Sequence, residues 1–383
     1  MKNFWNKLDR PFFALAPLAG YTDQSMRLMC KDFGVDVLYS EMISSEALWH
    51  NASCRSEYDL ESNRSRNKFM MTMNDKALLK TLNLIKFFQT ERPFVVQIFG
   101  AGPKHIAFAA KYIASGEWHK DLIQISNIKN QNGNEKIKDN NIANLIKFKN
   151  YDIENSLKIS SIPDGIDINM GCPARDVIKV GAGAALIKNQ HLACEIIKAV
   201  KKEVKNIPIS VKTRLGWNNE EEILDFSKRI EESGADALAI HGRTYKNGFC
   251  GPVNWDMILK VKRQLKIPVI GNGGINIDFD CKTVADLDGL MIGTGALGKP
   301  WIFEKLKNQS QTINEANWEF IKKNILKHAF LVNKLKGKQG ILEFRKHIVW
   351  YLKGIDGVKQ LRGELVRVSS YEEIEEILQR FTY

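Results

Sequence analysis

The stretch GIDINMGCPARD, residues 165–176, joins a short apolar run to a polar turn that holds a cysteine between a glycine and a proline. An apolar run of this length, ended by glycine and proline, is typical of a buried strand. A thiol at the end of such a strand admits four interpretations: a disulfide, a metal ligand, a packing residue or a catalytic acid. The rest of the chain decides between them.

Seven further apolar runs are like this one, and helix-like segments separate them. Residues 189–204 and 220–234, for example, carry apolar side chains at three- and four-residue spacing, which predicts amphipathic helices. Strands that alternate with helices form a parallel sheet, and eight such units predict a closed α/β structure, the (β/α)8 TIM barrel. The expected strands lie at 12–20, 36–42, 92–100, 165–171, 207–216, 236–244, 267–274 and 287–295.

Two regions fall outside this repeat. Residues 117–163 are polar and much longer than the usual connection of about 2–6 residues, so we expect an insertion in the form of a surface loop, whose lysines could contact a polyanion. Residues 310–383 have helical periodicity and predict an all-helical domain after a barrel domain of residues 1–309. Between 321 and 367, Lys and Arg exceed Asp and Glu by nine. This excess suits a nucleic-acid backbone, although a solvated helix face is the simpler alternative.

Composition narrows the class of protein. The 383-residue chain has no run of the roughly 20 apolar residues that a membrane helix needs, and its first residues lack the apolar core of a signal peptide, so we expect a cytoplasmic protein. A net charge of +12 favours an anionic partner such as nucleic acid, although lysine can also accumulate in an AT-rich genome. The six cysteines form no C-x-x-C pair and no His cluster accompanies them, which argues against disulfides and against a metal site.

Chemically distinctive residues end the expected strands, where the active site of a barrel lies. They are Pro17, Glu41, Gln97, Asn169 with Cys172, Lys212 with Arg214, His241, Asn272 and Gly293. A strand with only structural duties would not need a lysine or a histidine at its exit. We therefore predict a functional site at this rim of the barrel.

Glycine-rich turns GNGGI (271–275) and GTGALG (293–298) follow the last two strands, where backbone N–H groups can bind a phosphate. Lys212 and His241 lie on the two preceding strands, and the amide of Gln97 suits the edge of a heteroaromatic ring. Together these residues predict flavin mononucleotide (FMN) across the barrel mouth. Hydride transfer from a flavin to a double bond needs a proton at the neighbouring carbon, and the Cys172 thiol can donate it.

With these motifs the chain resembles the flavin-dependent tRNA dihydrouridine synthases. The resemblance rests on APLAGYTDQSMR, YSEMIS, VVQIFG, DINMGCPARDVIKVGAGAALIKN, VKTRLGW, LAIHGRT, PVIGNGGI and LMIGTGALGKPWIF. The tail EFRKHIVWYLKGIDG is similar to the family's C-terminal helical domain and looks most like the bacterial B-type subfamily. Only residues 117–163 fall outside the resemblance. It implies an enzyme that reduces the C5=C6 bond of specific uridines in tRNA with FMN, which NADPH re-reduces.

The resemblance also implies a role for each matching residue. Cys172 would donate a proton to C5 of uridine while the flavin delivers hydride to C6. FMN would contact Pro17, Leu18, Ala19, Gln97, Lys212, His241, Asn272, Gly273, Gly274, Gly293 and Thr294. The substrate would contact Asn169, Arg214, Arg345, Lys346 and His347. The family usually has Arg at the position of Thr294 and often Asp at that of Gly274, which implies a weaker cofactor site unless Lys299 compensates.

Two other functions share part of this pattern. A small-molecule flavin reductase, of the dihydroorotate or dihydropyrimidine dehydrogenase kind, has the barrel, the flavin and a loop cysteine, but it does not explain the basic helical region. A flavoprotein that binds or folds RNA without turnover would not need Cys172, Lys212 and His241. The pattern implies no protein partner, and we expect a monomer.

Overall fold

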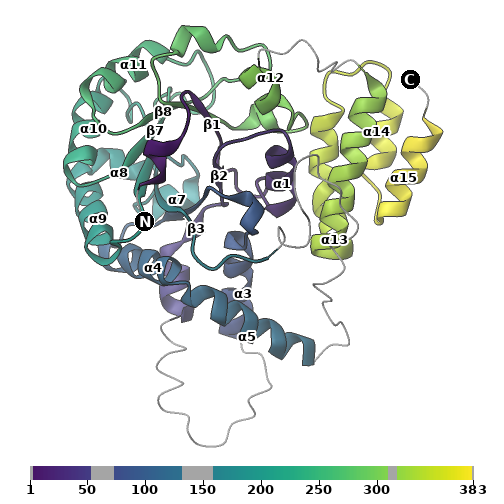
Figure 1. The fold of residues 1–383 in the computed structure, drawn as a ribbon, viewed down its shortest axis with the longest axis horizontal. Coiled ribbons are helices and arrows are strands. Elements are labelled where there is room, and N and C mark those ends of the chain that lie inside the picture. Colours follow the sequence, from purple (N-terminus) through teal and green to yellow (C-terminus); the bar gives the residue numbers. More distant parts are fainter. Residues whose placement is uncertain (1–2, 53–72, 132–157, 309–316, 382–383) are drawn as a thin grey trace, which may run out of the picture.

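The computed structural model describes residues 3–52, 73–131, 158–308 and 317–381, which form a barrel with a helical domain beside it (Figure 1). Parallel strands follow the order β1-β9-β8-β7-β6-β5-β4-β2, and β3 also pairs with β4. They are β1 (Phe12–Leu15), β2 (Leu38–Tyr39), β3 (Ile43–Ser44), β4 (Phe94–Phe99), β5 (Gly165–Met170), β6 (Ile209–Arg214), β7 (Ala237–His241), β8 (Val269–Asn272) and β9 (Gly289–Ile292). The N–H of Leu15 donates to the carbonyl of Val37 at 3.0 Å, which closes the ring. The predicted barrel is confirmed.

The second expected strand, residues 36–42, is reduced to the two residues of β2, and β3 follows just after its expected end; β2 and β3 pair with opposite ends of β4. The other strands are shorter than the apolar runs that predicted them, because residues at one or both ends of each run belong to the adjoining loops. In the barrel interior, Trp5, Phe12 and Tyr39 are fully buried in one apolar cluster. This layer makes the barrel a packed core and leaves its chemistry to the mouth.

Helices surround the barrel because each buries one apolar face against the strands. In α10, for example, Ile223, Phe226 and Ile230 are buried at three- and four-residue spacing. The helices of the barrel are α1 (Gln24–Asp32), α3 (Met73–Ile85), α4 (Pro103–Ser115), α5 (Glu117–Gln131), α7 (Arg175–Lys179), α8 (Ala185–Lys188), α9 (Gln190–Glu203), α10 (Glu222–Glu232), α11 (Trp255–Gln264) and α12 (Ile302–Asn308).

Helix α5 corrects part of the expected surface loop at residues 117–163. Trp118, Leu122 and Ile125 are buried on one face of this helix, and the indole N–H of Trp118 donates to the carbonyl of Ser161 at 2.6 Å. The spacing of these three apolar residues is helical, and the polar residues between them obscured it in the sequence. The most polar part of the expected insertion, residues 132–157, lies outside the described residues.

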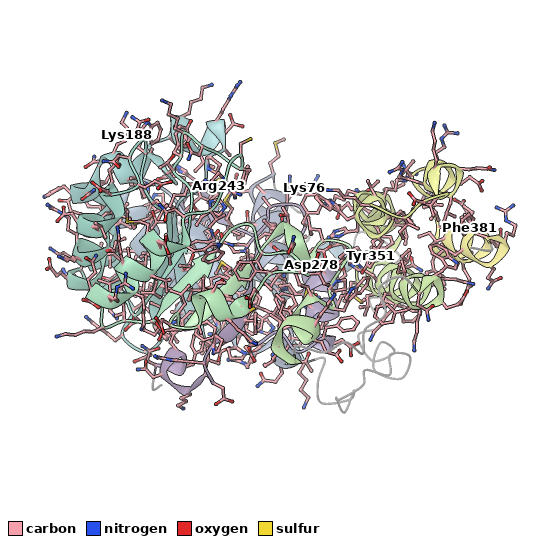
Figure 2. The ribbon with its side chains drawn as sticks, turned by 90° about the horizontal axis from the view of Figure 1, so that it is seen from above. Lys76, Lys188, Arg243, Asp278, Tyr351 and Phe381 are labelled. Carbon is pink, nitrogen blue, oxygen red and sulfur yellow. The ribbon has the colours of Figure 1, made fainter. Side chains whose placement is uncertain are left out.

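The C-terminal helices α13 (Trp318–Tyr351), α14 (Lys359–Leu365) and α15 (Tyr371–Arg380) form the predicted helical domain. Gly337 interrupts α13 with φ 59° and ψ −148°, and two helical segments meet there at a kink. Figure 2 shows this domain beside the barrel, with Tyr351 at the junction. In the described part of the chain, no helix combines the length and the apolar character needed to cross a membrane.

Candidate active site

The loop after β5 is held by Asn169, at the carboxyl end of that strand. Its Oδ1 accepts hydrogen bonds from the backbone N–H groups of Gly171 at 3.1 Å and Cys172 at 2.9 Å. A Cβ on Gly171 would lie 3.0 Å from the backbone carbon of Thr213, so a side chain here would crowd the neighbouring strand. The loop therefore holds Cys172, whose side chain is half-buried and whose thiol is free, at the barrel mouth.

Beneath this loop, hydrogen bonds join side chains of three adjacent strands. Asn169 Nδ2 donates to Gln97 Oε1 at 2.9 Å, and Gln97 Nε2 donates to Asp167 Oδ2 at 2.7 Å. Ser210 Oγ donates to the other oxygen of Asp167 at 2.6 Å. Burial raises the pKa of Asp167 to about 6, against the hydrogen bonds of Ser210 and Gln97 and the charge of Lys212. Gln97 is fully buried, and both ends of its amide are bonded within this network. Its contact with a flavin ring stays a prediction.

Positive side chains gather at the mouth on the strands that follow β5. Lys212 Nζ donates to Asn272 Oδ1 at 3.0 Å, and Asn272 Nδ2 donates to the carbonyl of Met291 at 2.7 Å. Burial, followed by the charge of Arg214, lowers the pKa of Lys212 to about 8. Burial and the neighbouring charges of Lys212, Arg214 and Arg243 lower the pKa of His241 to about 2. The charges of Lys212, Arg214 and Arg243 lie close together, so an anion bound among them would relieve their repulsion.

His241 Nδ1 is buried and has no hydrogen-bond partner within the described residues. Its Nε2 lies 3.4 Å from Nη1 of Arg243. Sequence reasoning missed Arg243, although it stands in the quoted motif LAIHGRT, because no expected strand ended at that residue. Its guanidinium points toward the turn at Gly274, where a Cβ would lie 3.9 Å from Nη2 of Arg243.

The two glycine-rich turns have the backbone that a phosphate site requires. Gly273 and Gly274 have φ +114° and +66°, and a Cβ on Gly273 would lie 2.9 Å from the imidazole of His241. A Cβ on Gly293 would lie within 3.8 Å of Ala16 and Leu18, so the exits of β9 and β1 adjoin. Thr294 is exposed at this edge. Leu18 therefore stands beside the predicted phosphate turn, in the loop that also carries Pro17 and Ala19.

Arg214 is committed to backbone groups. Its Nε donates to the carbonyl of Gly171 at 2.8 Å, and its Nη1 donates to that of Gly248 at 2.7 Å. The side chain is 3% exposed, and its guanidinium lies 5.1 Å from the ring centroid of Phe249. Arg214 thus ties the cysteine loop to the loop after β7, and its predicted contact with the target base stays a prediction.

The loop between β1 and α1 is fixed from both sides. Glu41, after β2, accepts a hydrogen bond from the N–H of Gly20, and burial raises the pKa of Glu41 despite that bond. From the helical domain, Lys346 Nζ lies 5.2 Å from the ring centroid of Tyr21. The loop that carries Leu18 therefore lies between the barrel and α13.

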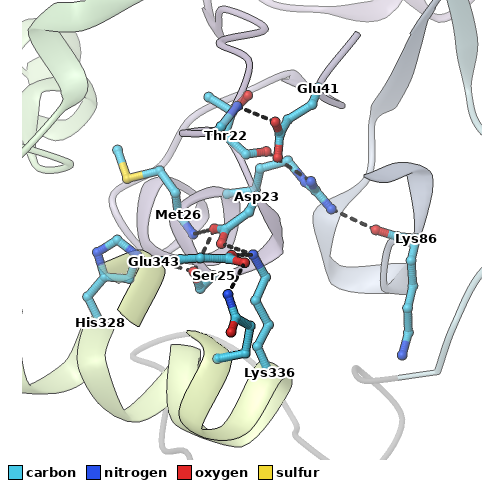
Figure 3. A network of polar contacts seen from close by, with 12 residues as sticks. Thr22, Asp23, Ser25, Met26, Glu41, Lys86, His328, Lys336 and Glu343 are labelled. Carbon is cyan, nitrogen blue, oxygen red and sulfur yellow. Dashed lines mark hydrogen bonds and ion pairs between the residues drawn. The ribbon is translucent and has the colours of Figure 1, made fainter. Parts of the chain in front are cut away.

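A polar cluster joins α1 to α13 at this boundary (Figure 3). Lys336 Nζ lies 2.7 Å from Asp23 Oδ2 and 2.9 Å from Glu343 Oε2. His328 contacts Ser25 Oγ through Nε2 at 3.3 Å and the hydroxyl of Tyr351 through Nδ1 at 3.2 Å. These contacts hold the helical domain against the loop that leaves β1.

The three residues of α13 that were expected to contact tRNA lie in different surroundings. Arg345 is half-buried and donates to the backbone carbonyls of Val368 at 2.7 Å and Arg367 at 2.9 Å. Lys346 is half-buried over Tyr21, whereas His347 is only 2% exposed. Burial lowers the pKa of His347 to about 4. Of the three, His347 faces the barrel and has no surface to offer a large partner in this arrangement.

Comparison with known proteins places the chain in a family. The family model described as dihydrouridine synthase (Dus) matches residues 14–125 and 155–382. The tRNA-dihydrouridine synthase B of Pasteurella multocida is 31% identical over 350 residues, covering 89% of this chain and 83% of that protein. The synthase B of Pseudomonas syringae is 29% identical over 367 residues, covering 94% of this chain and 87% of that protein.

A third relative, the probable tRNA-dihydrouridine synthase 1 of a Synechocystis strain, is 34% identical over 220 residues. That match covers 56% of this chain and 62% of the relative. Residues 126–154, which the family model leaves unmatched, fall inside the predicted insertion. The predicted resemblance is confirmed: the chain belongs to the dihydrouridine synthase family of oxidoreductases.

Proposed function

We propose that this protein is a tRNA dihydrouridine synthase that reduces specific uridines with FMN and is re-reduced by NADPH, as a monomer in the cytoplasm. The observation that carries the proposal is the position of Cys172, on a tightly held loop at the end of β5, close to Lys212 of the adjacent strand β6. The names of the B-type relatives support tRNA as the substrate.

The residues of the mouth fit a flavin phosphate. Lys212, Arg214 and Arg243 repel one another, and the Nδ1 of His241 is buried without a partner among the described residues. Gly273 and Gly274 have positive φ values that favour glycine, and a Cβ there would crowd His241 and Val253, so this turn keeps a bare backbone. Arg243, beside Gly274, can supply the positive charge that Thr294 lacks. When bound, FMN would supply the hydride that the reaction needs.

Cys172 would complete the reduction. The C5=C6 double bond of uridine accepts a hydride at C6 and a proton at C5, and the thiol hydrogen of Cys172 is the proton source on this side of the mouth. The hydrogen bonds that Asn169 accepts from the N–H groups of Gly171 and Cys172 fix the backbone that leads into the Cα of Cys172. A uridine must leave its stack to reach this thiol, so the target base would be flipped out of the tRNA.

The helical domain would bind the tRNA backbone with fewer free charges than the sequence suggested. Lys327 pairs with Asp32 at 2.6 Å and Lys336 pairs with Asp23 at 2.7 Å, so barrel carboxylates neutralise two of its lysines. Lys334, Lys338 and Lys353 remain on the surface. These exposed lysines would release counterions on binding and make tRNA affinity depend on salt.

The test is direct reduction of RNA by the full-length protein. Purified protein with FMN and NADPH is incubated with an unmodified tRNA transcript, and dihydrouridine is mapped by mass spectrometry as a gain of two hydrogens. We expect dihydrouridine at defined positions and none when free uridine or orotate replaces tRNA. Reduction of the small molecules instead would identify the rival flavin reductase, and tRNA binding with no product would identify an RNA-binding module.

A further inference from the structure

The hydrogen bonds beneath the cysteine loop form a chain with a fixed polarity. Its upper end consists of the N–H groups of Gly171 and Cys172, which can only donate, and its lower end is the carboxylate of Asp167, which can only accept. Two side-chain amides, those of Asn169 and Gln97, lie between these ends. Each amide has an NH2 group that donates and an oxygen that accepts. The N–H groups at the upper end and the carboxylate at the lower end therefore require the same arrangement, in which each amide oxygen faces the upper end and each NH2 group faces the lower end.

We propose that Asp167 is a positioning residue for the reaction, because its carboxylate orients Gln97 and Asn169 and thereby holds the backbone that carries Cys172. The reaction that Asp167 would serve is the one in the proposed function, on which this inference rests. The positioning role itself is argued from hydrogen-bond geometry. Four bonds between 2.7 and 3.1 Å connect the carboxylate to the cysteine loop.

The carboxylate of Asp167 accepts hydrogen bonds from two neighbouring side chains, those of Gln97 and Ser210. It is fully buried in β5, between Gln97 of β4 and Ser210 of β6, and it forms no ion pair within the described residues at the distances that define one. A buried carboxylate is costly, so an apolar side chain would give a more stable strand at this position. A functional role accounts for this cost: the carboxylate accepts from Nε2 of Gln97 and thereby keeps Oε1 of Gln97 turned toward Asn169.

Three substitutions separate orientation from simple packing. Asp167→Ala removes the acceptor and frees both amides to rotate. Asp167→Asn keeps an oxygen for Gln97, while its new N–H group can donate to the hydroxyl of Ser210, which accepts as well as donates. Ser210→Ala removes the other donor to Asp167 and leaves the chain to Cys172 intact, so it is the matched control for a lost buried hydrogen bond.

Two readouts are taken on the full-length protein. The first is the rate of dihydrouridine formation with saturating FMN and tRNA, where we expect about a 100-fold loss in Asp167→Ala from misplacement of the thiol. We expect about a fivefold loss in Asp167→Asn, because a neutral acceptor replaces a charged one, and near wild-type turnover in Ser210→Ala. The rescue by asparagine is the signature of an acceptor that orients an amide.

The second readout is the rate of alkylation of Cys172 by iodoacetamide, measured by mass spectrometry relative to the exposed Cys250 in the same molecule. A loosened loop exposes its thiol, so this ratio rises about tenfold in Asp167→Ala and stays near wild type in the other two variants. An unchanged ratio and turnover in Asp167→Ala, or equal losses in all three variants, would overturn the proposal. Alkylation needs no substrate, so it still decides the role of Asp167 if the wild type reduces no tRNA.

Discussion

The ammonium nitrogen of Lys336, on α13, lies 2.7 Å from Oδ2 of Asp23, the residue that caps the N-terminus of α1. The other oxygen of Asp23 accepts from the N–H of Met26 at 3.0 Å. One carboxylate therefore begins the first barrel helix and anchors the helical domain. We expect Lys336→Met and Asp23→Asn to be coupled by about 1 kcal/mol in a double-mutant cycle of urea unfolding, since the pair is partly exposed. Lys338→Met, on the exposed surface nearby, should cost less than about 0.5 kcal/mol.

The same pair predicts a dependence of stability on pH. Burial alone would raise the pKa of Asp23, but the charges of Lys336 and His347 and the hydrogen bonds of Lys336 and Ser25 lower it overall. A lowered pKa means that the contribution to stability is complete above the ordinary aspartate pKa of about 3.9 and is lost as the pH falls below it. The stability gap between wild type and Asp23→Asn should therefore close in acid.

Gly298, in the turn after β9, packs against the backbone of α13. A Cβ there would lie 2.2 Å from the carbonyl carbon of Trp350, and φ is +71°. We expect Gly298→Ala to lower the free energy of unfolding by about 3 kcal/mol, from the left-handed backbone and the overpacking together. Gly354→Ala is the control, since φ is +80° there but nothing lies within 4 Å, and it should cost about 1 kcal/mol. Equal costs would mean that the helical domain does not press on this turn.

Cys172→Ala should separate cofactor binding from catalysis. Cys172 is not among the residues expected to bind FMN, so we expect flavin absorbance to be retained. Loss of the proton donor should lower dihydrouridine formation in tRNA by about 100- to 10,000-fold. Cys250→Ala, which removes an exposed thiol, should turn over normally. Near wild-type turnover in Cys172→Ala would rule out the thiol as the acid.

Flavin affinity should fall as the pH rises above about 8. Burial and the charge of Arg214 lower the pKa of Lys212 to about 8, so the free site loses its lysine charge near that pH. A bound anionic cofactor stabilises the charged lysine and raises its pKa, so binding takes up a proton in this range. The dissociation constant of FMN, measured by fluorescence from pH 7 to 10, should rise up to about tenfold per pH unit above 8. Lys212→Met should bind more weakly and without this slope.

Thr294→Arg should tighten FMN binding by about tenfold, because an exposed hydroxyl at the phosphate turn would be replaced by a charge-assisted donor. Thr294→Gln lengthens the side chain without charge and is the control. If neither variant changes the dissociation constant, Arg243 already neutralises the phosphate.

Much of the fold follows from the sequence, because buried parallel strands are near-continuous apolar runs that glycine and polar residues end. The rim residues Asn169, Lys212, His241 and Asn272 were predicted for the same reason, since the ends of parallel strands meet at one edge. Asp167 was missed because it lies inside such a run and not at its carboxyl end, and its apolar neighbours conceal it. The burial of His347 could not be predicted, because it depends on which face of α13 packs against α1.

Helix α5 was missed for a different reason. Its three buried residues fill one narrow face, and the polar composition of the following residues dominated the interpretation of the whole region. The hydrogen bond from Trp118 to Ser161 is a contact between residues 43 positions apart, which periodicity does not report.

That bond also bears on how the family can diverge. Trp118 follows α4 and Ser161 precedes β5. Their hydrogen bond therefore joins the part of the barrel before the segment that the family model leaves unmatched to the part after it. The entropy of closing a loop grows by only about 0.6 kcal/mol for each doubling of its length. Insertions and deletions at this position therefore cost little folding free energy, so the length of the protein can vary here.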